Sequence, residues 1–125
     1  MGAFDVRLDH DLRVVRVMAT GELVRAAGER LITEARMTAA EAGYDILCDA
    51  RDVAPNVSLA AWFHLPRELE VLKDPKTARL KAAVLIPRGP LVEDYRFYEA
   101  VAANVGLQIR MFFDEEDALQ WLGRT

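Results

Sequence analysis

Two short, continuous apolar runs constrain the fold of this chain more than any other feature. One covers residues 45–48 and is apolar after its first residue, and the other covers residues 81–86. Strands that are covered on both faces have continuous apolar runs, whereas a strand with one solvated face alternates apolar and polar residues. The stretch between the two runs is long enough for a crossover helix, which a parallel pair of strands requires. The runs therefore predict two central, parallel strands of an α/β domain.

The amino-terminal third of the chain predicts a hairpin followed by a long helix. Two β-rich runs, residues 6–8 and 12–17, flank a polar cluster at residues 9–11 that suits a tight turn. After Gly21, apolar residues recur at helical spacing as far as Gly43, and glycine commonly ends a helix in the left-handed conformation. The sheet is therefore expected to begin with an antiparallel pair.

Three further helices are predicted, over residues 58–73, 91–105 and 115–122. A last strand is predicted between the second and third of them, over residues 107–113. Pro66 removes a backbone donor inside the first of these helices, so we expect a kink there or two short helices. Asp114 is the expected N-cap of the last helix. The pattern predicts one α/β domain over residues 1–125, with an N-terminal β-hairpin leading into a mostly parallel five-stranded sheet and about four helices.

Composition narrows the class of protein. The chain has 125 residues, 52% of them hydrophobic, which is enough for one core. The single cysteine, Cys48, cannot form an internal disulfide, and its place in a strand predicts a buried thiol. The net charge is −4 and the basic residues are dispersed, so nucleic acid is not an expected partner. No run approaches the roughly 20 apolar residues of a spanning helix, and no secretory leader is recognisable, so we expect a cytoplasmic protein without an integral membrane segment.

Two stretches carry a resemblance to a known family. Residues 46–53 form an apolar strand that ends in Asp49 and a charged turn, and residues 112–122 join an acidic helix start to Ala-Leu-x-Trp-Leu. In these stretches, and in the order of its elements, the chain resembles the SpoIIAA-like (STAS/SEC14-type) domains. The resemblance implies a non-enzymatic regulatory module that binds a protein partner or a second copy of itself.

Ser58 is the only serine, and it follows Asp49 by nine positions. The spacing is similar to that in the anti-sigma factor antagonists of the wider group, where phosphorylation of the serine switches binding. The resemblance therefore implies phosphorylation of Ser58, whose phosphate would lie at a helix N-terminus near Arg51 or Arg88. The alternative is that the Ser58 hydroxyl only caps the helix.

Charged residues follow the predicted central strands and are candidates for binding a ligand or partner: Asp49, Arg51, Asp52 and Arg88. Open α/β sheets usually bind ligands at the carboxyl ends of their strands. The alternative is that these residues form turns and ion pairs. Asp49 and Asp52 could act as a catalytic pair only beside a substrate pocket, for which the sequence gives no separate evidence, so no catalytic residue is assigned.

Aromatic and aliphatic side chains cluster before the predicted kink. Trp62 and Phe63 are adjacent, so one narrow buried stripe cannot cover both of them together with Leu65. An exposed apolar surface of this kind marks a dimer interface, a groove for an apolar small molecule or lipid, or a membrane contact, while the alternative is ordinary core packing. The SEC14 side of the resemblance makes lipid a candidate ligand.

No metal or cofactor is predicted. His64 and Glu68 are four residues apart, as two ligands on one helix face would be, but Pro66 lies between them. The sequence has no His-Glu-x-x-His motif, no second cysteine and no glycine-rich loop for a phosphate.

Overall fold

The computed structural model describes residues 2–54 and 65–124 and contains one five-stranded sheet. The strands lie in the order β1-β2-β3-β4-β5, with the bounds Ala3–Asp9, Val14–Gly21, Asp45–Val53, Ala82–Leu85 and Ile109–Phe112. β1 pairs with β2 in antiparallel register, and the other pairs are parallel. The predicted hairpin and mostly parallel sheet are confirmed.

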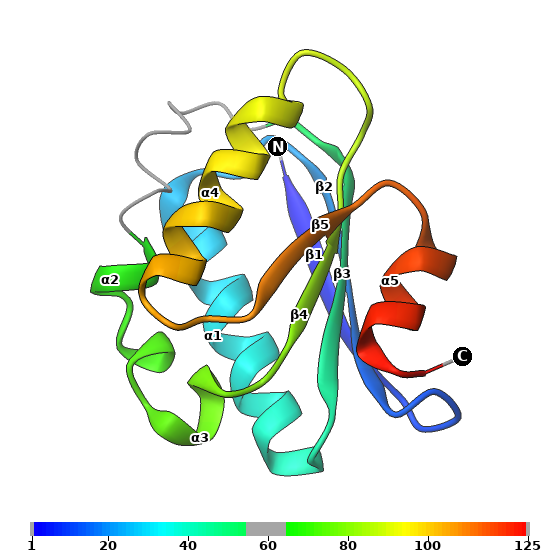
Figure 1. Ribbon diagram of the computed structural model, residues 1–125, viewed down its shortest axis with the longest axis vertical. Helices are drawn as coiled ribbons and strands as arrows, with labels where there is room; N and C mark the ends of the chain where they lie inside the picture. Colours follow the sequence, from blue (N-terminus) through cyan, green and yellow to red (C-terminus); the bar gives the residue numbers. More distant parts are fainter. Residues whose placement is uncertain (1, 55–64, 125) are drawn as a thin grey trace.

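The helices form a layer on each face of the sheet (Figure 1). Helices α1 (Arg25–Ala42) and α4 (Val92–Asn104) cover one face, together with the short elements α2 (Leu65–Glu68), η2 (Glu70–Leu72) and α3 (Pro75–Ala78). Helix α5 (Glu115–Leu122) packs on the other face. In the described part of the helix predicted over residues 58–73, α2 and η2 are separate short elements with the break at Leu69, and Pro66 is the second residue of α2. Residues 58–64 of that predicted helix lie outside the described residues.

Alternation along the strands divides the buried side chains between two cores. In β2, Val15 and Val17 face α1, whereas Val14 faces α5. In β4, Ala82 faces α1, whereas Ala83 and Leu85 pack against α5 through residues such as Ala118 and Leu122. The central strands are therefore buried on both faces, which is why they are continuous apolar runs in the sequence.

β3 is longer than the sequence predicts. It continues to Val53, beyond the predicted end at residue 48, because the long strand β2 pairs with it over its whole length. The register shifts between Met18 and Thr20, whose partners are Asp49 and Asp52, so β3 contains one extra residue in a bulge. Charged residues are accommodated in this half of β3 because α5 does not cover the sheet there.

Two smaller features also differ from the expectations. Asp114 occupies the N-cap position of α5, as predicted, but its side chain makes no capping hydrogen bond. Helix α3 was not predicted, although Asp74 and Pro75 form a recognisable start signal, with the Asp74 side chain accepting a hydrogen bond from the backbone N–H of Lys76. None of the described helices is long and apolar enough to cross a bilayer.

Candidate functional site

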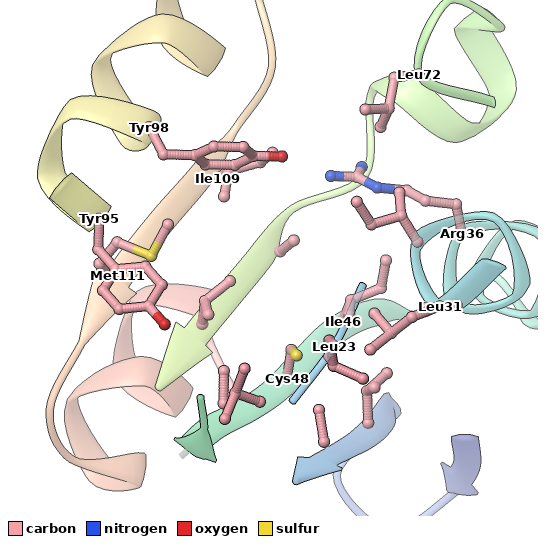
Figure 2. Close-up of a pocket in the computed structure, with 18 of the residues that line it drawn as sticks. Leu23, Leu31, Arg36, Ile46, Cys48, Leu72, Tyr95, Tyr98, Ile109 and Met111 are labelled. Carbon is pink, nitrogen blue, oxygen red and sulfur yellow. The ribbon is translucent and has the colours of Figure 1, made fainter. Parts of the chain in front are cut away.

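A cavity of about 150 Å³ lies between the sheet and the two long helices α1 and α4 (Figure 2). Its floor is formed by side chains of four strands that point to the same face, among them Val17 of β2, Ile46 and Cys48 of β3, Val84 of β4 and Met111 of β5. Its sides come from α1, through Leu31 and Ile32, and from α4, through Tyr95 and Tyr98. The wall is almost entirely carbon, as is typical of sites for apolar small molecules.

Small side chains create this space. Four alanines line the cavity, and each comes from a different element: Ala19 from β2, Ala35 from α1, Ala50 from β3 and Ala82 from β4. Leucine or isoleucine at these positions would project into the space above the sheet and fill it. The cavity therefore follows from the choice of small residues on one face of the central strands and on α1.

The Cys48 thiol is part of the cavity wall. Cys48 is only half-buried although it lies on a central strand, because its side chain borders the cavity. Loss of hydration raises the pKa of the Cys48 thiol to about 12, with a smaller contribution from the nearby Asp49 carboxylate. The thiol therefore remains protonated at neutral pH, and it behaves as an apolar wall group.

Two tyrosines of α4 bring hydroxyl groups to the cavity. Burial raises the pKa of Tyr98 to about 12, against the opposing effect of the positive charge of Arg36. Burial also raises the pKa of Tyr95. Figure 2 shows the Tyr98 hydroxyl pointing across the cavity toward Arg36. The Tyr95 hydroxyl does not point toward Arg36. Asp94, an exposed residue in the first turn of α4, also lines the cavity, so the cavity reaches the surface there.

Arg36 of α1 is a buried charged group in the cavity wall, with an exposed fraction of only 2%. Its Nη1 atom donates hydrogen bonds to the backbone oxygens of Thr77 at 3.0 Å and Leu80 at 2.9 Å. Burial lowers the pKa of Arg36 to about 10, so the guanidinium is still charged at neutral pH. Arg36 thus holds the α3 segment against α1 and brings a positive charge to an otherwise apolar cavity.

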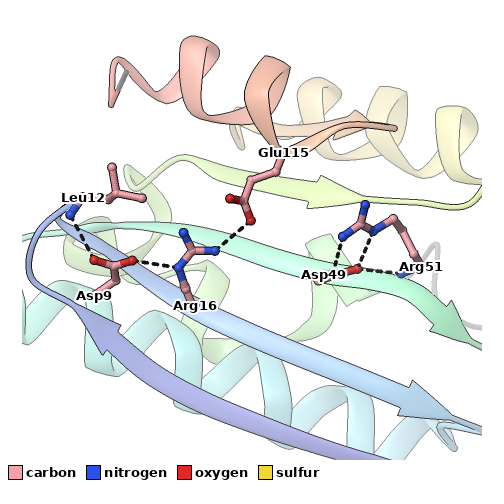
Figure 3. Close-up of polar contacts among 6 residues, drawn as sticks. All are labelled: Asp9, Leu12, Arg16, Asp49, Arg51 and Glu115. Atoms are coloured by element: carbon pink, nitrogen blue, oxygen red, sulfur yellow. Dashed lines mark hydrogen bonds and ion pairs between the residues drawn. The ribbon is translucent and has the colours of Figure 1, made fainter.

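The part of the opposite sheet face that α5 leaves uncovered carries paired charges (Figure 3). Arg16 donates to the carboxylates of Asp9 and Glu115, both at 2.8 Å, and so links β2 to the hairpin turn and to α5. The hydrogen bond from Arg16 lowers the pKa of Asp9, aided by one from the backbone N–H of Leu12. These residues form a structural ion-pair network.

Asp49 and Arg51 form a second pair on the same face (Figure 3). The Asp49 carboxylate accepts hydrogen bonds from the Arg51 backbone N–H at 3.1 Å, from Nε at 3.0 Å and from Nη2 at 2.7 Å. The side-chain hydrogen bond from Arg51 is the main cause of a lowered pKa of Asp49. Asp49 is therefore ionised at neutral pH and unsuited to donate a proton.

The predicted strand-end cluster is only partly assembled. Asp49, Arg51 and Asp52 lie within β3, not beyond its end as predicted, because β2 continues alongside them. Arg88 does follow β4, but its guanidinium carbon lies 4.2 Å from the centre of the Phe113 ring, in a cation–π contact.

The other predicted site residues fall on or beside the segment that is not described. Ser58, Trp62, Phe63 and His64 lie outside the described residues, and Leu65 is the first residue of α2. Phosphorylation of Ser58 and an apolar groove lined by Trp62, Phe63 and Leu65 stay predictions. In residues 2–54 and 65–124, no group of three or more His, Cys, Asp or Glu side chains is arranged to hold a metal ion.

The comparisons with known proteins identify the fold. No protein-family profile matches the sequence, and no curated protein matches it. The structure is similar to that of an uncharacterized DUF3478-family protein with a SpoIIAA-like fold from Shewanella loihica PV-4, with 22% identity and a TM-score of 0.56 over 97% of this chain and 93% of that one. It is also similar to the anti-sigma factor antagonist SpoIIAA in its unphosphorylated form, with 19% identity and a TM-score of 0.53 over 98% of this chain and 100% of that one. This protein therefore has the SpoIIAA-like fold that its sequence predicted.

Proposed function

We propose that this protein is a non-enzymatic binding module that carries or senses an apolar small molecule in the cavity between the sheet, α1 and α4. The observation that carries the proposal is the cavity itself, with its volume of about 150 Å³ and its wall of aliphatic, aromatic and thiol groups. An apolar cavity of roughly this volume can hold a molecule the size of benzene.

The energetic cost of the cavity supports a functional interpretation. Protein interiors are close-packed, and space lined by apolar side chains is unfavourable when those side chains lack contacts. A single larger residue in place of Ala82 or Ala35 would remove much of that cost. A bound apolar molecule would recover it in the wild-type protein, because a ligand that binds only the folded state stabilises it.

Native mass spectrometry of protein purified gently from its own host tests the proposal, in parallel with thermal unfolding in the presence of toluene. We expect an additional mass that is lost on denaturation, and a higher Tm with toluene. Ala82→Leu, which fills the cavity, is expected to abolish both effects, whereas Val6→Phe, which enlarges a half-buried residue on the same sheet face outside the cavity lining, should retain them. A bare protein mass together with an unchanged Tm would rule the proposal out.

A second candidate function is docking of a protein partner on the uncovered face of the sheet. The supporting observation is the exposed charge there, since the Arg51 side chain is 43% exposed beside the ionised Asp49, and Asp52 is exposed. Charged surfaces of this kind steer association and select partners. SpoIIAA, to which the fold is similar, is described as an anti-sigma factor antagonist, and phosphorylation of Ser58 would belong to this function.

Affinity capture with wild-type protein and an Arg51→Glu variant tests the second candidate. We expect a partner that is recovered with the wild-type protein and lost with Arg51→Glu, while Arg13→Glu, a charge reversal in the hairpin turn, retains it. Equal recovery by all three proteins would show that the partner does not dock on this face.

A further inference from the structure

The guanidinium of Arg36 has donors left over after its structural contacts are made. Both N–H groups of Nη1 are used by the backbone oxygens of Thr77 and Leu80. Among the described residues, no group accepts a hydrogen bond from Nε or Nη2 of Arg36. An arginine has five N–H donors, so three of them lack an acceptor although the side chain is 98% buried.

The positive charge of Arg36 also lacks a contacting counter-ion within the described part of the chain. Asp45 contributes a favourable but more distant field, and its carboxylate already accepts hydrogen bonds from the backbone N–H of Lys81 at 2.9 Å and from Arg124 at 3.3 Å. A buried charge without a contacting anion, and with part of its donors unpaired, is unfavourable. The folded protein therefore keeps a cation that is only partly satisfied by its two backbone hydrogen bonds at the wall of an apolar cavity.

The Tyr98 hydroxyl supplies a further donor at the same place. It points toward the Arg36 guanidinium from the opposite side of the cavity (Figure 2), and none of the described residues forms a hydrogen bond with it. A planar guanidinium binds a carboxylate through two parallel N–H groups, and a phenol can donate to the same carboxylate. Two donor groups thus converge on a space that no described side chain fills.

We propose that the ligand of this cavity is a monocarboxylate with a small apolar body, whose carboxylate lies between Arg36 and Tyr98. This inference rests on the proposed function, and it adds the chemical class of the ligand. The apolar body, about the size of a phenyl ring or a short aliphatic chain, lies over the strands against Cys48 and Val84. Asp94 at the surface end of the cavity disfavours a second negative charge on the ligand.

Isothermal titration of the wild-type protein with phenylacetate and with phenylacetamide tests the inference, because the two molecules have nearly the same shape and differ in charge. A charge-assisted hydrogen bond in a buried site changes affinity by roughly tenfold or more. We therefore expect phenylacetate to bind at least tenfold more tightly than phenylacetamide.

Two matched variants locate the effect. Tyr98→Phe removes only the hydroxyl that faces Arg36, and we expect it to weaken phenylacetate binding roughly tenfold with little change for phenylacetamide. Tyr44→Phe is the control, since it removes a tyrosine hydroxyl that pairs with His10 outside the cavity lining, and the affinity for phenylacetate should change less than twofold. Arg36→Met, if it folds, should bind toluene and lose its preference for phenylacetate.

Each outcome decides between the two proposals. Equal affinity for phenylacetate and phenylacetamide, or binding of toluene alone, would overturn the carboxylate inference and leave the proposed function standing. Binding of none of the three molecules would overturn both. Equal losses in Tyr98→Phe and Tyr44→Phe would show that the carboxylate does not lie beside Arg36.

Discussion

The Nη1 atom of Arg36 lies 2.9 Å from the backbone oxygen of Leu80, so the middle of α1 is joined directly to the segment that enters β4. The same nitrogen donates to the backbone oxygen of Thr77. One residue therefore fastens the short helix α3 to α1 and carries the charge in the cavity wall.

Replacement of Arg36 by methionine should destabilise the protein by about 1–3 kcal/mol. Two buried backbone oxygens lose their donors, which is unfavourable, but removal of a buried cation without a contacting anion offsets part of the loss. Urea unfolding of the purified variant measures the change. A variant more stable than the wild-type protein would show that burial of the charge outweighs both hydrogen bonds.

Neighbouring alanines in β4 should respond in opposite ways to the same enlargement. Ala82 borders the cavity and Ala83 packs against α5 with an exposed fraction of 0%. Leucine at position 82 fills existing space, so we expect stability unchanged or raised, whereas leucine at position 83 overpacks a dense core and should cost about 1–3 kcal/mol. Thermal unfolding of both variants provides the measurement, and an equal loss in the two would contradict the presence of usable space above Ala82.

The Cys48 thiol predicts a pH dependence at alkaline pH. Its pKa rises from 9.0 to about 12 on folding, so the unfolded chain loses the proton first and the folded state loses stability as pH rises above about 9. Between about pH 8 and about pH 10.5, the wild-type protein should lose about 2 kcal/mol relative to Cys48→Ala. Urea unfolding of both proteins at the two pH values gives the difference in their free energies of unfolding, in which the contribution of the tyrosines cancels. If that difference is the same at both pH values, the prediction is refuted.

The ion pair on the uncovered face should have a small effect on stability and a clear effect on titration. Arg51 lowers the pKa of Asp49, so the pair contributes stability above the ordinary pKa of an aspartate and loses it as pH falls. Because the Arg51 side chain is 43% exposed, Arg51→Met should cost less than about 1 kcal/mol. Carboxyl ¹³C NMR should show the pKa of Asp49 rising toward 3.8, while Arg110→Met, near Trp121, leaves it unchanged.

The fold could be predicted from the sequence because its signals are local. Each signal depends only on residues that are close together in the sequence. Examples are the apolar runs around Leu47 and Leu85, the polar hairpin turn and the end of the helix at Gly43. The extension of β3 to Val53 could not be predicted, since it depends on pairing with β2, and the charged residues 49, 51 and 52 resemble a turn when they are read alone.

The cavity was missed for a related reason. Its wall combines residues from four strands, the two long helices and η2, and nothing in the sequence shows that Ala82 and Ala35 face the same space. Arg36 looks like an ordinary surface residue of a helix, and its burial becomes apparent only when α3 packs beside α1. An arginine within the apolar face of a predicted helix is the one signal that could have indicated it.

Methyl NMR of the wild-type protein titrated with phenylacetate tests the central claim most directly, because it reports where a ligand binds. The account predicts shifts of the methyl groups of Val17, Val84 and Ile109, which line the cavity, and little change at Val14, Leu85 and Leu122 on the α5 side. Shifts confined to the α5 side, or no shifts at all at saturating phenylacetate, would contradict it.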